Sequence, residues 1–138
     1  MQLKYADDLG KHQNCPPSTA IPHAKEAFRF VFATIEDGRN FLPVAKLTPQ
    51  RKLRPQDHCV AHALSMYVTR QQAIDRYRFL SSGHENFYKT AGDHLARGVM
   101  CADDGHGCHY HSNGHFSFFE SETANLSTKF SVLEKPTE

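Results

Sequence analysis

The chain has 138 residues, of which 39% are hydrophobic and 22% charged, so it is long enough for one domain with a continuous core and too apolar for a disordered chain. Its 16 Lys and Arg residues balance 15 Asp and Glu residues, which excludes a uniformly basic protein that binds nucleic acid or a membrane surface. No apolar run approaches the roughly 20 residues needed to cross a bilayer, and the opening MQLKYADDLG lacks the apolar region of a secretory signal. We therefore expect a cytoplasmic protein with no membrane partner, in which Cys15, Cys59, Cys101 and Cys108 are thiols.

The N-terminal segment, residues 1–22, is polar, ends in CPPSTAIP and has no sustained periodicity. Such a segment favours an arm outside the packed core, so we place a single domain at residues 23–138. The first strand of that domain is predicted at residues 27–35, AFRFVFATI, where phenylalanines alternate with Arg29 and smaller residues.

A basic segment, KLTPQRKLRPQ at residues 46–56, carries cationic side chains and no acid. It is either a binding loop for a phosphate-bearing partner or a solvated loop broken by prolines. The apolar run HCVAHALSMYV, residues 58–68, predicts a buried central strand. In that strand His58 and His62 share one face and Cys59 lies on the other, which favours a buried thiol beside core histidines over a nucleophilic cysteine.

A helix follows this strand. Thr69 and Gln72 have the spacing of a capping box, and apolar residues recur at helical spacing as far as the Ser-Ser-Gly at residues 81–83. Residues 83–92 predict a short second helix, and the alternation in HLARGVM, residues 94–100, predicts a strand.

Two further strands are predicted near the end of the chain, at residues 114–122, GHFSFFESE, and at residues 129–134, KFSVLE. The order of elements is then strand, strand, helix and three strands. This order predicts an α+β fold, with a mainly antiparallel sheet and one or two helices in a single compact domain.

The tract CADDGHGCHYHSNGH, residues 101–115, concentrates cysteine and histidine. Thiolate and imidazole are good zinc ligands, and histidines two apart in an extended chain share a face. The candidate metal ligands are Cys108, His109, His111 and His115. The alternative is a hydrophilic hairpin loop in which glycines supply positive φ angles and the histidines are solvated.

Three features occur in a suggestive order along the chain. Arg29 lies in the first predicted strand, Ser65 in the buried strand, and Glu120-Ser-Glu122 closes a late strand. This order resembles the arginine, serine-strand and Glu-x-Glu arrangement of the mono-ADP-ribosyltransferase superfamily, which is found in many small bacterial toxin and effector domains. The resemblance covers residues 27 to about 134.

The resemblance implies a role for each of these residues. Arg29 would hold the phosphates or a ribose of NAD, and Ser65 would position the ribose. Glu122 would stabilise the oxocarbenium-like state formed when the nicotinamide bond breaks, and Glu120 would orient the acceptor. The two glutamates fall on one face of an extended strand; the alternative is that they are solvated charges at a strand end.

The function that the resemblance implies is a toxin or defence effector that consumes NAD and modifies a protein or nucleic-acid acceptor, with an antitoxin as a further partner. The alternative class is a non-catalytic, zinc-stabilised module that binds its partner through the basic segment and the aromatic-rich strands.

Overall fold

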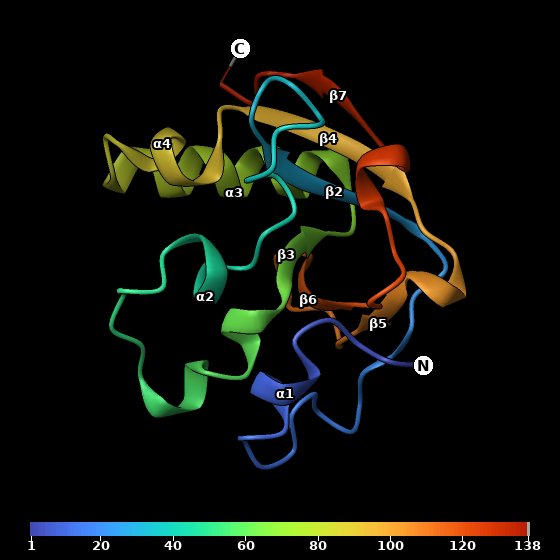
Figure 1. Cartoon of the computed structure of the whole chain (residues 1–138). Helices are drawn as coiled ribbons and strands as arrows, with labels where there is room; N and C mark the ends of the chain where they lie inside the picture. The colour runs from blue at the N-terminus through green and yellow to red at the C-terminus, as the bar shows by residue number, and fades with distance from the viewer. Residues whose placement is uncertain (138) are drawn as a thin grey trace.

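The computed structural model describes residues 1–137, and its strands form one antiparallel sheet (Figure 1). The strands are β1 (Ile21–Pro22), β2 (Glu26–Val31), β3 (Leu64–Tyr67), β4 (His94–Val99), β5 (Gly105–Gly107), β6 (His115–Glu120) and β7 (Phe130–Glu134). Their order across the sheet is β1-β5-β6-β3-β2-β4-β7, and every pair of neighbours is antiparallel. The predicted α+β fold with a mainly antiparallel sheet in a single compact domain is thus confirmed.

The two faces of the sheet are buried differently. On one face, the alternate residues of the central strands form a continuous apolar core, whose fully buried members include Ala27, Met66 and Phe118. On the other face, Phe28 and Tyr67 pack under a helix. Period-two alternation in β2 and β3 therefore decides on which face each side chain lies.

The predicted helix is α3 (Arg70–Gly83), and the hydroxyl of Thr69 accepts a hydrogen bond from the main-chain N–H of Gln72, as the capping pattern predicted. The short second helix is α4 (Phe87–Ala91), and Figure 1 shows it beside α3. Within residues 1–137, no helix is both long and apolar enough to cross a membrane.

The strand predicted at residues 58–68 is shorter than expected. Only β3 is extended, and the residues before it form two 3-10 turns, η1 (Pro55–Asp57) and η2 (Val60–His62). A short apolar run does not distinguish a strand from a buried turn, since both bury apolar side chains, so periodicity could not set this boundary. Before η1, α2 (Val44–Leu47) adds one more helical turn to a long excursion between β2 and β3, drawn in teal and green in Figure 1.

The N-terminal segment joins the sheet at both of its ends. Leu3 forms an isolated antiparallel bridge with Ser121, just beyond β6, and β1 pairs with β5. Between them, α1 (Ala6–Leu9) places Leu9 in an apolar cluster with Phe119. The arm predicted at residues 1–22 thus lies against the domain and extends its sheet.

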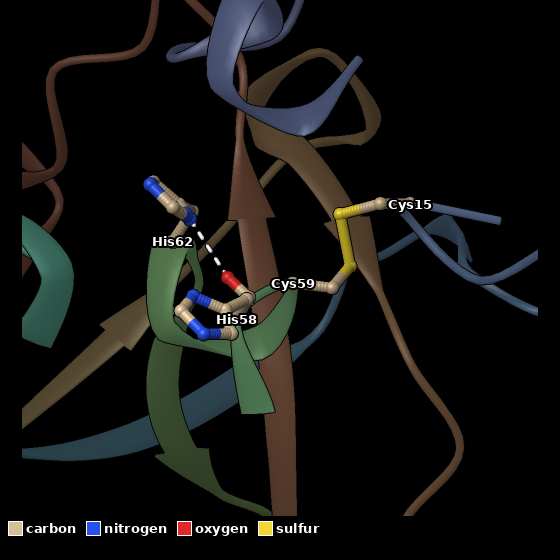
Figure 2. The surroundings of a disulfide bond; sticks show 4 residues. All are labelled: Cys15, His58, Cys59 and His62. Carbon is tan, nitrogen blue, oxygen red and sulfur yellow. Dashed lines mark hydrogen bonds between the residues drawn. A yellow bond between two sulfur atoms is a disulfide. The ribbon is translucent and has the colours of Figure 1, made fainter. Parts of the chain in front are cut away.

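A disulfide joins Cys15 to Cys59, so the prediction that these two cysteines are thiols is wrong (Figure 2). The two residues are 44 apart in sequence and their Cα atoms are 5.6 Å apart, a proximity that comes from the folding of the N-terminal segment onto the turn before β3. Figure 2 shows the imidazoles of His58 and His62 pointing away from the disulfide. Of the four cysteines, Cys101 and Cys108 are free.

Candidate functional site

The sheet opens between β2 and β3. The two strands pair at a single position, Phe28 with Tyr67, whereas β2 pairs with β4 along its whole length. Arg29 spans the opening: its Nη1 donates a hydrogen bond of 2.7 Å to the carbonyl oxygen of Ser65, and its Nε donates one of 2.9 Å to the carbonyl oxygen of Asn40. The Arg29 guanidinium thus links β2 to β3 through the Ser65 carbonyl, where main-chain hydrogen bonds between the strands are missing, and it links β2 to the excursion through the Asn40 carbonyl.

A cleft of about 530 Å³ lies at this opening, within the range of roughly 300–1,000 Å³ that is typical of small-molecule sites. Its floor is formed by β2 and β3, and its walls by the excursion between these strands and by residues of α3 and α4. The cationic and aromatic side chains that line the cleft are Arg29, Arg39, Arg51, Phe30, Phe32, Tyr67 and Phe87. Among the described residues that line it there is no carboxylate, so the cleft favours an anionic ligand with flat apolar parts.

Arg29 is the most deeply placed of the three arginines. Burial lowers the pKa of Arg29 to about 10, while the charge of Glu120 acts to raise it. The guanidinium therefore remains a cation at neutral pH. A partly buried cation at the floor of a cleft interacts more strongly with a ligand phosphate than an exposed one, because less water screens the pair.

Ser65 lines the same cleft, but its hydroxyl has an unexpected partner. Register places Ser65 opposite Ser117 and Tyr67 opposite His115, so these four side chains lie on the face covered by α3. The Nε2 of His115 is 3.1 Å from the Oγ of Ser65, and the Tyr67 ring packs edge-on against the imidazole. Burial, together with the charges of His111 and Arg76, lowers the pKa of His115 to about 4, so this imidazole is neutral at neutral pH.

Glu120 lies at the end of β6 on the opposite face, the face to which Arg29 belongs by alternation. The carboxylate is buried, with 5% of the residue exposed, and its Oε2 accepts a hydrogen bond of 2.6 Å from the Nζ of Lys4. Its Oε1 is buried without a partner, and burial raises the pKa of Glu120. The residue lines a separate cavity of about 180 Å³ rather than the cleft.

Glu122 is not on the strand. Strand β6 ends at Glu120, and Glu122 lies in an exposed turn, where its main-chain N–H donates to the carbonyl oxygen of Gln2. The prediction that one strand carries both Glu120 and Glu122 is therefore wrong: β6 ends at Glu120, Ser121 forms only an isolated bridge with Leu3, and a turn begins at Glu122. Of the predicted NAD-site residues, Arg29 and Ser65 line one cleft, while the two glutamates lie outside it.

The predicted metal ligands do not converge. In residues 1–137, no group of three or more His, Cys, Asp or Glu side chains is arranged to hold a metal ion. Cys108 packs against an apolar cluster, and burial raises the pKa of its thiol. His115 turns to Ser65, whereas His109 and His111 are exposed. The tract instead forms a hairpin between β5 and β6, in which Gly114 has a φ of 82°.

Sequence reasoning missed several residues of the cleft. Tyr67 follows Ser65 by two positions in a strand, and this spacing was the signal that both share a face. Arg51 belongs to the basic segment at residues 46–56, where a phosphate-binding loop was one of two interpretations. Nothing local indicated Arg39, because only the long excursion between β2 and β3 brings it to the cleft.

Comparison with known proteins finds no relative of this chain. The chain matches no protein-family model, no curated protein and no solved structure.

Proposed function

We propose that the cleft between β2 and β3 binds NAD, and that the protein is an NAD-consuming domain of the ADP-ribosyltransferase type, acting as a toxin or defence effector on a protein or nucleic-acid acceptor. The observation that carries the proposal is the lining of the cleft: among residues 1–137, three arginines, four aromatic rings and no carboxylate surround about 530 Å³. An NAD molecule offers this lining two phosphates and two flat rings.

The arginines are suited to a diphosphate. A guanidinium presents several N–H donors in a plane and binds phosphate oxygens in pairs. Arg39 lies with its guanidinium 3.6 Å from the centre of the Phe32 ring and pairs with Asp37, so it is held in place before a ligand arrives. Arg51 is exposed at the cleft wall and is available for a phosphate.

The aromatic side chains are suited to the flat rings of a nucleotide. Phe30 stacks on Tyr67 with ring centroids 5.1 Å apart, and Phe87 packs edge-on against Phe30 at 6.2 Å. Tyr67 is buried, so Phe30 and Phe87, which are partly exposed, are the rings that can meet a ligand, and stacking on such rings contributes about 1–3 kcal/mol per base.

The sheet order also supports the proposal. Strands β2, β3 and β6 carry Arg29, Ser65 and Glu120, the residues on which the resemblance rests, and these strands are immediate neighbours in the sheet. Arg29 and Glu120 interact electrostatically across the core face, and each shifts the pKa of the other toward the charged form. On this proposal, Glu120 is the better candidate than Glu122 for the carboxylate that the reaction needs.

A second candidate function is NAD or nucleotide binding without cleavage. It is favoured by one specific observation: neither Glu120 nor Glu122 lines the cleft. Cleavage of the nicotinamide bond needs a carboxylate close to the ribose, because the developing positive charge is stabilised only at short range.

The binding step is tested by titrating the full chain with NAD and following heat release. Arg51→Gln should weaken the affinity by about tenfold, which corresponds to the loss of one charge-assisted contact. Lys52→Gln is the matched control, since Lys52 is also exposed but does not line the cleft. Equal affinities for wild type and both variants, or no binding of NAD, would reject the proposed site.

The catalytic step is tested by measuring nicotinamide release from NAD by the wild type. Release that is abolished in Glu120→Gln and retained in Glu122→Gln would support the transferase with Glu120 as its carboxylate. Release that is retained in Glu120→Gln and abolished in Glu122→Gln would assign the catalytic carboxylate to Glu122. Tight NAD binding with no release, with or without protein and nucleic-acid acceptors, would establish the non-catalytic candidate instead.

A further inference from the structure

The geometry points to a second activity: we propose that Ser65 is a nucleophile activated by His115, and that the pair attacks carboxylic esters that carry an anionic group. The proposal rests on the contact between these two side chains at the cleft and does not depend on NAD binding.

Ser65 and His115 contact each other directly. The Nε2 of His115 lies 3.1 Å from the Oγ of Ser65, which is within hydrogen-bond reach of a serine and its general base. Both residues lie on paired strands, so the contact is set by the sheet and not by mobile loops. A base held on rigid elements is positioned before the substrate binds.

The hydroxyl of Ser65 is accessible from the cleft. Ser65 is exposed and lines the cleft, whereas the neighbours on its own strand, Leu64 and Met66, are buried in the core. A ligand in the cleft therefore meets the hydroxyl directly. The other serine on this face, Ser117, does not line the cleft, and no hydrogen bond joins its hydroxyl to a histidine among the described residues.

The imidazole of His115 is in the right protonation state for a base. His115 is partly buried between Tyr67, whose ring centroid is 5.5 Å away, and His111, at 5.4 Å. The imidazole is neutral at neutral pH and is free to accept a proton. It is also a weak base, so we expect slow turnover, and a covalent probe of the serine is the more sensitive measurement.

The reaction balances without a further reagent except water. The imidazole Nε2 takes the hydroxyl proton while the Oγ of Ser65 forms a bond to the ester carbonyl carbon. The tetrahedral intermediate then expels the alcohol, which takes the proton from the imidazolium. Water, deprotonated by the same imidazole, attacks the acyl carbon; the Oγ of Ser65 leaves, takes the proton back from the imidazolium, and the acid is released. The cleft arginines would hold the anionic group of the ester, since no carboxylate of residues 1–137 lines the cleft to repel it.

The experiment labels the full chain with a fluorophosphonate, which forms an Oγ–P bond with an activated serine and expels fluoride. Peptide mapping should find the label on Ser65. His115→Ala should slow labelling at least tenfold, as expected for the loss of a general base, which contributes about 10²–10⁴-fold. Ser117→Ala is the matched control and should label at the wild-type rate, and protein unfolded in urea should not be labelled.

Two results would overturn the proposal: an unlabelled Ser65 in the folded wild type, or equal labelling rates in wild type and His115→Ala. Circular dichroism checks that each variant is folded, and His115→Gln replaces the alanine variant if that variant unfolds. Substrate class is tested with nitrophenyl esters. The hemisuccinate, which is anionic, should be hydrolysed faster than the neutral acetate, and equal rates would reject the part assigned to the arginines.

Discussion

The Nη1 of Arg29 lies 2.7 Å from the main-chain carbonyl oxygen of Ser65, at the place where β2 and β3 have ceased to pair. The same guanidinium donates through Nε to the carbonyl oxygen of Asn40. One side chain thus satisfies an acceptor from β3 and an acceptor from the excursion that precedes β3. The floor and one wall of the cleft depend on it.

Replacing Arg29 by Met keeps a long apolar stem but leaves the carbonyl oxygens of Ser65 and Asn40 without this donor. We expect a loss of about 2–4 kcal/mol in the free energy of unfolding, since each bond to a charged donor contributes about 1.5–3 kcal/mol and water will replace part of it. Urea denaturation measures this difference. Arg97→Met is the control: Arg97 pairs with Glu26 at the surface, and such pairs contribute about 0–1 kcal/mol. Equal losses in the two variants would contradict the bridging role of Arg29.

His115 should make stability depend on pH. Its folded pKa is about 4, below its ordinary value of 6.5, so the unfolded chain binds a proton first as the pH falls. The stabilisation is complete above pH 6.5 and is lost as the pH falls toward 4. It amounts to no more than about 3 kcal/mol, because a pKa unit corresponds to about 1.4 kcal/mol. The cationic groups that face His115 and oppose its protonation are His111 and Arg76.

The measurement compares the free energy of unfolding of the wild type and His115→Gln between pH 7 and pH 4. The advantage of the wild type should shrink as the pH is lowered. His109→Gln substitutes an exposed imidazole in the same hairpin, and its free energy of unfolding should change with pH in the same way as that of the wild type. A constant difference between the wild type and His115→Gln across this range would show that the imidazole is not held neutral by its surroundings.

Gly92 is expected to tolerate no side chain. It has a φ of 84°, and a Cβ atom there would lie 2.1 Å from the carbonyl oxygen of Val31. The Gly92 carbonyl also accepts a hydrogen bond of 2.7 Å from the Tyr77 hydroxyl, which ties the end of α4 to α3. Gly92→Ala should therefore cost at least about 2 kcal/mol, from backbone strain plus displacement of β2. Gly38→Ala, where nothing lies within 4 Å of the added atom, should change stability by less than about 0.5 kcal/mol in thermal unfolding. Similar melting temperatures would contradict the close approach.

The sequence predicted the helices and strands better than it predicted the contacts between them. The alternation around Arg29 and the capping pattern at Thr69 are local, and both gave the correct element. The assembly of the site was not local: the strand period places Ser65 and Arg29 on opposite faces, and only the opening between their strands lets the guanidinium reach the serine main chain. The histidine beside Ser65 could not be inferred, because strand register depends on the whole sheet.

The two glutamates and the disulfide-bonded cysteines also depend on contacts that local sequence patterns do not reveal. A Glu-x-Glu pattern implies one face only if the strand continues through it, and here β6 ends at Glu120 and a turn begins at Glu122, beside the bridge between Leu3 and Ser121. Likewise, spacing within the sequence carries no information on a disulfide that spans 44 residues between an arm and a turn. Both features depend on where residues 1–15 lie, and their polar composition did not indicate this.

The disulfide between Cys15 and Cys59 should stabilise the fold strongly, because it closes a long loop in the unfolded chain. For a sequence separation of 44 residues, chain entropy gives about 4 kcal/mol. The paired variant Cys15→Ser with Cys59→Ser should lose free energy of unfolding on this scale. Cys101→Ser is the control, since Cys101 is free and exposed, and it should remain close to the wild type. Equal stability of the paired variant and the control would show that the N-terminal contacts hold the arm without the disulfide.

The same bond should also affect the cleft, because the turn that carries Cys59 places Val60 in its wall. The N-terminal segment also contacts this wall elsewhere: Lys46 pairs with Asp8 at 2.8 Å, His58 stacks on His12 with centroids 5.6 Å apart, and Leu9 packs in an apolar cluster with Ala63. The ion pair and the imidazole stack are individually weak and Leu9 contributes a single side chain, so reduction should loosen the wall and lower the affinity of the cleft for its ligand. Titration of NAD with and without dithiothreitol measures the change. The paired serine variant should bind with the affinity of the reduced wild type in both conditions, and an affinity unaffected by reduction would mean that Val60 is fixed by packing alone.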